Sequence, residues 1–406
     1  MKTSPPVFND HNVYILGAGF SVRAGLPVVS DFMDRMRDSP NWLGRNGFER
    51  AADAVRRVLG FRLESAGASY RIQIDPENIE QLFSLAAARG DHESDEFDDD
   101  DVPRAIAGTL EYAKATSARV AAIMTLETAK LHLAPATWKE GKTLATFQRK
   151  MPLYEALLGI MTNLWSNPQP NCQNTLISFN YDLVVEAHLG NLKIPFSYGF
   201  REGTVHRVCA GYAADAEMRL LKLHGSVNWS VCDDAETKDG TTPAIDLSRI
   251  HLHDDFRALS RRNADPVLIP PTWRKGALGP LSEVWMNAVG AIQNATRIIV
   301  IGYSMPTIYQ HFKYLLAAGL QRNVSLRKII FVNPGLDKNH REAAELRARI
   351  TSVLRPELVD RGMIDFSGSG VENFLGTPDS RRAINRELPP ILQNPVVGIW
   401  GEVDEV

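Results

Sequence analysis

A histidine followed by glycine stands directly behind a short apolar run, in the stretch Lys222-Leu223-His224-Gly225. The ordinary pKa of histidine, near 6.5, makes this side chain a ready base at neutral pH, and the glycine leaves room for a substrate against the ring. A single histidine is more often a structural residue whose neighbours satisfy it. His224 is therefore a candidate base that needs partners elsewhere in the chain.

An asparagine and an aspartate lie two positions apart behind another apolar run, in Ser178-Phe179-Asn180-Tyr181-Asp182. An asparagine side chain both donates and accepts hydrogen bonds, so Asn180 can hold an amide, a ribose hydroxyl or a water molecule. The alternative is that both residues form a turn or cap a helix, which their side chains favour. Ligand binding is favoured for Asn180, and both interpretations stay open for Asp182.

A glycine loop, Gly17-Ala18-Gly19-Phe20-Ser21, follows the first apolar run of the chain. Glycine permits a tight turn and a close approach of the backbone to a pyrophosphate, and a helix that follows offers unpaired N–H groups. The third glycine of a GxGxxG motif is absent. So is an acidic residue behind a second strand about 20 residues on, where a dehydrogenase holds the ribose. The loop is a phosphate-site candidate or a plain strand–helix turn, and a dehydrogenase is disfavoured.

Continuous apolar runs that end at glycine or polar residues predict buried parallel strands. Five such runs are present: Val13 to Leu16, Thr175 to Phe179, Leu220 to Leu223, Arg297 to Ile301, and Lys328 to Val332. In open α/β sheets, ligands bind at the carboxyl ends of the strands. The last two runs end directly before Gly302 and Asn333, so both residues are expected at the ligand edge of the sheet.

The long stretch of residues 40–165 predicts a helical insertion. Apolar residues recur at three- and four-residue steps behind Asp75-Pro76-Glu77, a good helix start, and they are Ile79, Leu82, Phe83, Leu85 and Ala86. Residues 103–133 and 147–165 show similar spacing. The acidic run from Asp91 to Asp101 interrupts the insertion and predicts a solvated loop, with an acidic docking site as the alternative.

Composition and charge exclude several classes of protein. The chain has 406 residues, 44% hydrophobic and 23% charged, with a net charge of −3, which is typical of a soluble globular protein and gives no general attraction to nucleic acid or membranes. The sequence lacks an apolar run of about 18 residues and a signal peptide, so we expect a cytoplasmic protein. Cys172, Cys209 and Cys232 form no CxxC pair, which disfavours a zinc site and a disulfide framework.

The order of five short motifs resembles that of the sirtuins: GAGxS, xxNxD, HG, GxS, and an asparagine behind the last strand. The phrases GAGFSVRAGLP, SFNYD, KLHGSVNW and IGYSMP are more similar still to the sirtuin-like domains of bacterial antiphage defence systems, which consume NAD. The resemblance covers about residues 13–335, with Asn78 to Phe83 matching the helical region. Each motif is short, but five in the same order are specific.

This resemblance implies an α/β fold, a Rossmann-like, mostly parallel sheet with a helical insertion at about residues 40–165. Residues 1–335 would form the catalytic domain and residues 336–406 a C-terminal extension. NAD would be the substrate, no metal is expected, and Asn180 and His224 would be catalytic. The residues expected to contact NAD are Gly17, Ala18, Gly19, Phe20, Ser21, Asp182, Gly302, Ser304 and Asn333.

Departures from the deacylating sirtuins indicate water as the acceptor. Those enzymes carry two CxxC pairs, a Pro-Asp-Phe-Arg segment where Leu26-Pro27-Val28-Val29 stands here, and a peptide-pairing Phe-Gly-Glu segment where the stretch from Pro266 to Trp273 stands here. The implied function is hydrolysis of NAD to nicotinamide and ADP-ribose by an antiviral defence effector. An NAD-dependent protein deacylase and a non-catalytic NAD or ADP-ribose sensor are the alternatives.

Unrestrained NAD hydrolysis would kill the producing cell, so we expect control from outside the chain. The resemblance suggests a homo-oligomer with a companion protein such as a HerA-type ATPase or a short Argonaute. The helical insertion and the tail from Leu388 to Val406 are the expected contacts. The alternative is that the tail packs on its own domain and the enzyme is slow. No direct binding of nucleic acid or membranes is expected.

Overall fold

The computed structural model of the chain describes residues 10–69, 71–89, 101–124, 129–133, 147–151, 153–162, 172–232, 246–271, 281–305, 311–337, 342–371 and 374. The acidic run, except Asp101, and the tail from Leu388 lie outside these residues. Within them, no helix has both the length and the apolar character that a membrane crossing requires.

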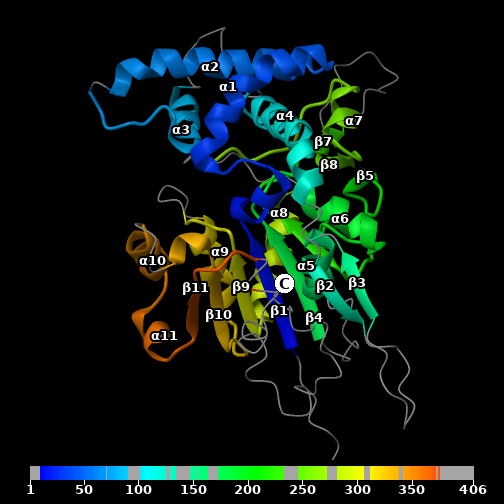
Figure 1. The fold of residues 1–406 in the computed structure, drawn as a ribbon, viewed down its shortest axis with the longest axis vertical. Coiled ribbons are helices and arrows are strands. Elements are labelled where there is room, and N and C mark those ends of the chain that lie inside the picture. The colour runs from blue at the N-terminus through cyan, green and yellow to red at the C-terminus, as the bar shows by residue number, and fades with distance from the viewer. Residues whose placement is uncertain are drawn as a thin grey trace, which may run out of the picture.

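A six-stranded parallel sheet in the order β11-β10-β9-β1-β4-β6 forms the centre of the molecule (Figure 1). Its strands are β1 (Asp10–Leu16), β4 (Cys172–Ser178), β6 (Arg219–Lys222), β9 (Arg297–Ile301), β10 (Lys328–Val332) and β11 (Ile364–Ser367). Read from β6, these are the third, second, first, fourth, fifth and sixth strands of the sheet in chain order. That is the order of doubly wound, dinucleotide-binding sheets, with the reversal between β1 and β9. The predicted α/β, Rossmann-like fold is confirmed, and so are its five predicted strands.

The strands are apolar on both faces because helices cover a parallel sheet on both sides. All five residues of β9 are buried, and Val13 to Leu16 of β1 are at most 2% exposed. Parallel neighbours need long crossover connections. The helices along these connections are α5 (Leu153–Met161), α6 (Val184–Leu192), α8 (Leu281–Gln293), α9 (His311–Leu320), α10 (Ala343–Ser352) and α11 (Pro356–Asp360).

Four helices form a layer beyond the carboxyl ends of the strands (Figure 1). This helical layer consists of α1 (Val29–Arg45), α2 (Glu49–Ser69), α3 (Ile79–Arg89) and α4 (Asp101–Met124). The predicted helix behind Asp75 is confirmed as α3. The helical layer begins earlier than residue 40, because α1 already starts at Val29.

Two predicted helical stretches are wrong in part. Residues 103–133 and 147–165 contain the strands β2 (Ala129–Leu133) and β3 (Phe147–Met151), which pair antiparallel with each other. Ala129–Leu133 alternates apolar and polar residues over only five positions, too short a pattern to distinguish from a helical one. Phe147–Met151 has three polar residues in a row and no alternation that would indicate a strand.

A second, three-stranded sheet has the order β5-β8-β7 and was not predicted. It consists of β5 (Val205–Arg207), β7 (Trp229–Cys232) and β8 (Asp246–Leu252), and the short helix α7 (Phe256–Ser260) follows it. The central sheet also continues past residue 335, since β11 pairs with β10. The division of the chain at residue 335 stays a prediction, but the sheet itself crosses it.

Candidate functional site

The candidate residues follow neighbouring strands at one level of the sheet. Leu16 of β1 is in register with Ser178 of β4 and Ile301 of β9, and Ile301 is in register with Val332 of β10. Ser178 is in turn in register with Lys222 of β6. Five adjacent strands therefore end together. In spatial order, the groups at this edge are Asn333, Gly302 to Ser304, Gly17 to Ser21, Asn180 to Asp182, and His224.

The His224 ring is held in one orientation by a hydrogen bond to the loop after β4. The side chain is buried, and its Nδ1 lies 3.1 Å from the carbonyl oxygen of Phe179. A carbonyl only accepts hydrogen bonds, so Nδ1 donates, and in the neutral form of the ring the lone pair lies on Nε2. The rings of Phe179, Tyr181 and His311 lie within 5.0, 5.9 and 6.2 Å of the His224 ring, centre to centre. A buried imidazole with its lone pair on Nε2 can act as a general base.

The turn that carries His224 is fixed by the stretch after α7. Gly225 has φ +78°, and a Cβ there would lie 1.9 Å from the carbonyl oxygen of Val267. The N–H of Ile269 donates to the carbonyl oxygen of His224 at 2.9 Å, and Gly225 pairs antiparallel with Leu268. Only glycine fits this turn, because the carbonyl of Val267 occupies the place where a side chain would begin. Room for a substrate beside the His224 ring stays a prediction.

Asn180 joins the loop after β4 to the loop after β1. Its Nδ2 donates to the carbonyl oxygen of Gly17 at 2.9 Å and to Oγ of Ser21 at 3.2 Å. Its backbone N–H donates to Oγ of Ser178. Among the described residues no group donates to its Oδ1, which leaves that oxygen for a ligand hydroxyl, amide or water. Asn180 thus has both a structural role and an acceptor to offer.

Asp182 caps a helix, as the structural interpretation of the sequence has it. Its Oδ1 accepts the N–H of Val184 at 3.0 Å, at the start of α6. The side chain also lies on the wall of a cavity described below. A contact between Asp182 and NAD stays a prediction.

The glycines of the first loop are required by a second loop. A Cβ on Gly17 would lie 2.6 Å from the carbonyl oxygen of Gly302, and one on Gly19 would lie 2.8 Å from the Cα of Gly302. Gly302 itself has φ +64°, and a Cβ there would lie 2.5 Å from the backbone nitrogen of Phe20. The loops after β1 and β9 therefore touch backbone to backbone at the point where the strand order reverses.

This packing uses most of the amide groups that were expected to face a pyrophosphate. The N–H groups of Gly19, Phe20 and Ser21 donate to backbone carbonyls at 2.9 to 3.0 Å, whereas that of Ala18 has no acceptor in the described part of the chain. Phe20 is 1% exposed and packs edge-on against Tyr154, so its side chain lies in the core. Contacts of these residues with NAD stay predictions, with Ala18 the best placed.

The expectation of a helix directly after this loop is wrong. The loop itself contains a short 3₁₀ turn, η1 (Ala18–Phe20), a second one, η2 (Val22–Ala24), follows it, and α1 begins only at Val29. Gly25, with φ +82°, ends the second turn in a left-handed conformation and turns the chain toward the helical layer.

The last two candidate groups differ in how they are used. Ser304 is exposed and makes no hydrogen bond to the described residues. Asn333 instead caps η3 (Pro334–Leu336): its Oδ1 accepts the N–H of Gly335 at 2.9 Å, and its Nδ2 donates to the carbonyl oxygen of Tyr303 at 3.4 Å. The sheet brings both residues to the common edge, and their contact with a ligand stays a prediction.

Lys222, two positions before His224, is a residue whose role the sequence did not indicate. Its side chain is 2% exposed, and Nζ lies 2.9 Å from Oε1 of Glu186 and 2.8 Å from Oγ of Ser226. It also donates to the backbone carbonyls of Tyr181 and Asp182. The sequence does contain one sign of this role: Lys222 is a charged residue inside the apolar run from Leu220 to Leu223. Lys222 ties the loop of Asn180 to the strand of His224.

Glu80 of α3 is a second residue near the site that the sequence did not indicate. Burial, and then the charge of Glu80, raise the pKa of the hydroxyls of Tyr181 and Tyr303 well above the ordinary value of 10. Glu80 itself is 7% exposed. The helical layer therefore contributes a buried carboxylate near two aromatic rings of the site.

A cavity of about 760 Å³ borders the strand-end site. Its wall is formed by α4, α6 and the segment before α7, and it reaches the site through Ala24, Leu26 and Asp182. Neither His224 nor Asn180 lies on its wall. The cavity therefore lies beside the candidate catalytic residues and does not contain them. Across the described ranges, no group of three or more His, Cys, Asp or Glu residues is arranged to hold a metal ion.

No protein-family model matches this chain, and no curated protein matches its sequence. Similar solved structures are Sir2 enzymes. One described as a structural basis for the mechanism and regulation of Sir2 enzymes has 14% identity over 93% of each chain and a TM-score of 0.38. A Sir2 homologue in complex with ADP ribose has 13% identity over 93% of this chain and 95% of its own, with a TM-score of 0.34. Sir2 with a p53 peptide and NAD+ has 11% identity over 92% of each chain and a TM-score of 0.32. Likeness at this level leaves the chemistry to be argued from this chain's own residues.

Proposed function

We propose that this chain binds NAD along the carboxyl ends of β10, β9, β1, β4 and β6 and hydrolyses it to nicotinamide and ADP-ribose. The observation that carries the proposal is the alignment of five motifs on five adjacent strands, with the imidazole of His224 at one end of the row. Open α/β sheets bind dinucleotides at the switch in strand order, which here lies between β1 and β9. The exposed Ser304 and the N–H of Ala18 would contact phosphate or ribose on either side of that switch.

The proposed reaction needs a base and a positioned nucleophile. The bond between nicotinamide and the ribose C1′ breaks, its electron pair leaves with the nicotinamide ring nitrogen, and a water oxygen bonds to C1′. The proton released goes to Nε2 of His224, directly from water or by way of a ribose hydroxyl, and then to solvent. Oδ1 of Asn180 orients the water or the ribose. Positioned base catalysis contributes about 10²- to 10⁴-fold to such a rate.

The cavity beside Asp182 is large enough to accept the nicotinamide that leaves. It is walled largely by apolar groups, including Leu26, Phe196 and Phe256, and a neutral nicotinamide ring is a planar, mostly apolar body. We propose that nicotinamide leaves into this cavity while the ADP-ribose part stays at the strand ends.

We further propose that the enzyme depletes NAD in antiviral defence, as a homo-oligomer controlled by a companion protein such as a HerA-type ATPase. The support is the resemblance of the motifs to defence-associated domains and the need to restrain NAD hydrolysis in the producing cell. Light scattering on the purified chain tests the assembly. A monomer at micromolar concentration that turns NAD over fully without a partner contradicts this part.

One product analysis tests the function. Purified protein is incubated with NAD alone, with NAD and an acylated lysine peptide, and with NAD and the products of neighbouring genes, and products are separated by liquid chromatography and mass spectrometry. A hydrolase gives nicotinamide and ADP-ribose in equal amounts without peptide. A deacylase gives an acyl-ADP-ribose only when the peptide is present. NAD that binds but stays intact in every arm identifies a sensor and refutes hydrolysis.

A further inference from the structure

The segment of residues 265–269 is the partner of the His224 turn. Ile269 donates its N–H to the carbonyl oxygen of His224 at 2.9 Å, and the carbonyl oxygen of Val267 accepts the N–H of Ser226 at 3.2 Å. Val267 also donates to the carbonyl oxygen of Trp229 at 2.8 Å. Three backbone hydrogen bonds thus connect this segment to both sides of the turn, so a shift of the segment displaces the imidazole.

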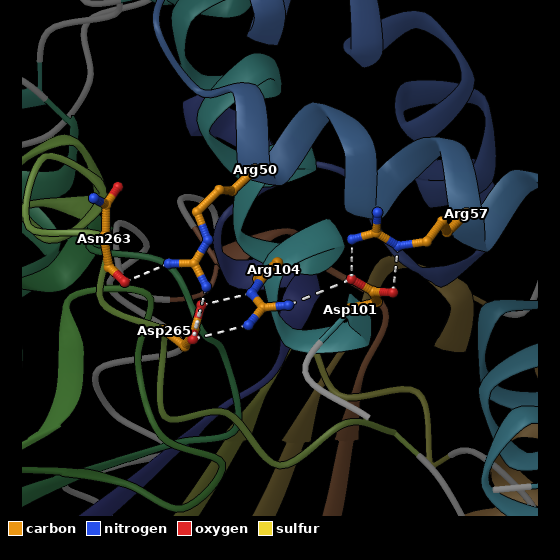
Figure 2. A network of polar contacts seen from close by, with 6 residues as sticks. All are labelled: Arg50, Arg57, Asp101, Arg104, Asn263 and Asp265. Carbon is orange, nitrogen blue, oxygen red and sulfur yellow. Dashed lines mark hydrogen bonds and ion pairs between the residues drawn. The ribbon is translucent and has the colours of Figure 1, made fainter. Parts of the chain in front are cut away.

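The same segment begins at Asp265, which two arginines of the helical layer bind (Figure 2). Arg104 of α4 binds Asp265 with two hydrogen bonds, Nε to Oδ1 at 2.6 Å and Nη2 to Oδ2 at 2.9 Å. Arg50 of α2 adds Nη2 to Oδ2 at 3.1 Å and also donates to the carbonyl oxygen of Asn263, whose φ is +52°. Two helices therefore hold the carboxylate and the turn before it, and we name Arg50, Arg104 and Asp265 the arginine clamp.

Figure 2 shows Arg104 between Asp265 and a second aspartate, Asp101. Asp101 is fully buried and accepts two hydrogen bonds of 2.6 Å from Arg57 of α2. Arg104 itself is 12% exposed and lies 3.5 Å from Asp101. The planar guanidinium with two parallel hydrogen bonds is the arrangement that fixes orientation as well as distance. The two parallel hydrogen bonds of Arg104 thus orient Asp265, while Asp101 has its own two hydrogen bonds from Arg57.

The charges of Arg104 and Arg50 stabilise the ionised form of Asp265. Burial by itself would raise the pKa of Asp265, but the hydrogen bonds and charge of Arg104, with the charge of Arg50, hold that pKa below its ordinary value of 3.8. Asp265 is therefore ionised at neutral pH, and the clamp is charged on both sides. The two hydrogen bonds between Arg104 and Asp265 fix the distance between α4 and the segment, which a single contact between flexible surface side chains would not do.

We propose that Asp265 is a positioning residue for His224: the arginine clamp fixes the start of segment 265–269, and the segment's backbone fixes the turn that carries the base. The seating of the helical layer on the sheet thereby sets the position of the imidazole. This inference rests on the proposed function only in taking His224 as the base.

The test uses two changes to the clamp and one matched control. Asp265→Asn keeps the shape of the side chain and removes its charge, and Arg104→Lys keeps the charge and removes the two-pronged geometry. Arg57→Lys is the same substitution on the other arginine of Asp101, and it leaves Asp265 and its partners in place. In full-length protein labelled with ¹³C and ¹⁵N at its ten histidines, the His224 imidazole is assigned by comparison with His224→Asn. NAD turnover is measured on the same samples.

We expect Asp265→Asn and Arg104→Lys to shift the His224 imidazole resonances and to lower kcat about tenfold, with KM within about twofold, because displacing a catalytic group by 1 Å can cost about 10²-fold. Arg57→Lys leaves both readouts as in the wild type. Unchanged His224 resonances in both clamp variants overturn the proposal. Equal shifts in all three variants also overturn it, since they indicate general loosening of the helical layer. If Asp265→Asn does not fold, Arg104→Lys decides alone. If wild-type protein cleaves no NAD, the proposed function fails, while the resonances still decide the role of Asp265.

Discussion

Replacing Lys222 by methionine should destabilise the protein severely. The side chains of Lys222 and Glu186 are 2% and 10% exposed, and the Lys222 ammonium also binds Ser226 and the carbonyls of the loop after Asn180. Removing one partner of a buried ion pair costs about 3–5 kcal/mol, because the other charge is left uncompensated. Tyr198 still donates to Glu186 at 3.0 Å, so we expect the lower end, about 3 kcal/mol. For a chain of this length that corresponds to a fall in Tm of about 3.5 °C.

The assay is a double-mutant cycle in urea and thermal unfolding, with Lys222→Met, Glu186→Gln and the double variant. The double variant should recover part of the loss, because it leaves no unpaired charge. Lys328→Met is the matched control: Lys328 pairs with Asp365 at 3.0 Å on the same sheet, but the two side chains are 22% and 43% exposed. An exposed pair of this kind contributes about 0–1 kcal/mol.

Equal losses of Tm in Lys222→Met and Lys328→Met would refute this reasoning, since burial would then make no difference. So would strict additivity of the two single changes in the cycle. NAD turnover adds a second readout, because the loop that Lys222 holds also carries Asn180. Turnover in Lys222→Met, measured well below its Tm, should fall by more than in Lys328→Met.

Three further outcomes are expected. Gly302→Ala should yield unfolded or insoluble protein, because its φ of +64° disfavours a side chain and the new Cβ would lie 2.5 Å from the nitrogen of Phe20; a soluble variant with wild-type Tm speaks against the loop contact. Asn180→Ala should lose NAD cleavage but only about 1 kcal/mol of stability, since its hydrogen bonds are partly buried; nicotinamide release at the wild-type rate removes Asn180 from the mechanism. Burial, then the neighbouring charges of His251 and two arginines, lower the pKa of His253 from 6.5 to about 4, so the native state resists a proton that the unfolded chain accepts. The free energy of unfolding is therefore unaffected by His253 above pH 6.5 and falls by up to about 3 kcal/mol as the pH drops to 4. A His253→Gln variant whose Tm has the same pH dependence as the wild type excludes this cause.

The central sheet could be predicted because its strands carry their burial in their own residues. A run such as Arg297–Ile301, apolar on both faces, fits few other positions in a fold. Two of the strands that were missed, β5 and β11, are different. Val205–Arg207 has two exposed residues out of three, and Ile364–Ser367 has one buried residue out of four. Their pairing is decided by the partner strand, which a local pattern does not contain.

The candidate site was predictable to the same extent. Asn180 and His224 follow predicted strands, so their meeting at one edge follows from the topology. Lys222, Glu80 and Asp265 act through partners far away in the chain: Arg104 and Asp265 stand 161 positions apart. A lone charged residue in a sequence does not reveal whether it is buried against an opposite charge. The glycine loop was singled out as a phosphate site, which stays a prediction, and the close contact that its glycines make is with Gly302.

The most direct test of the account is the rate of nicotinamide release from NAD by wild-type protein and by His224→Ala, under conditions in which the wild type turns over. His224 presents the lone pair of Nε2 because Nδ1 donates to Phe179. The account predicts a loss of kcat of about 100-fold or more in His224→Ala, with Tm within a few degrees of the wild type. A variant that keeps its fold and releases nicotinamide within about twofold of the wild-type rate would contradict the role of His224 as the base.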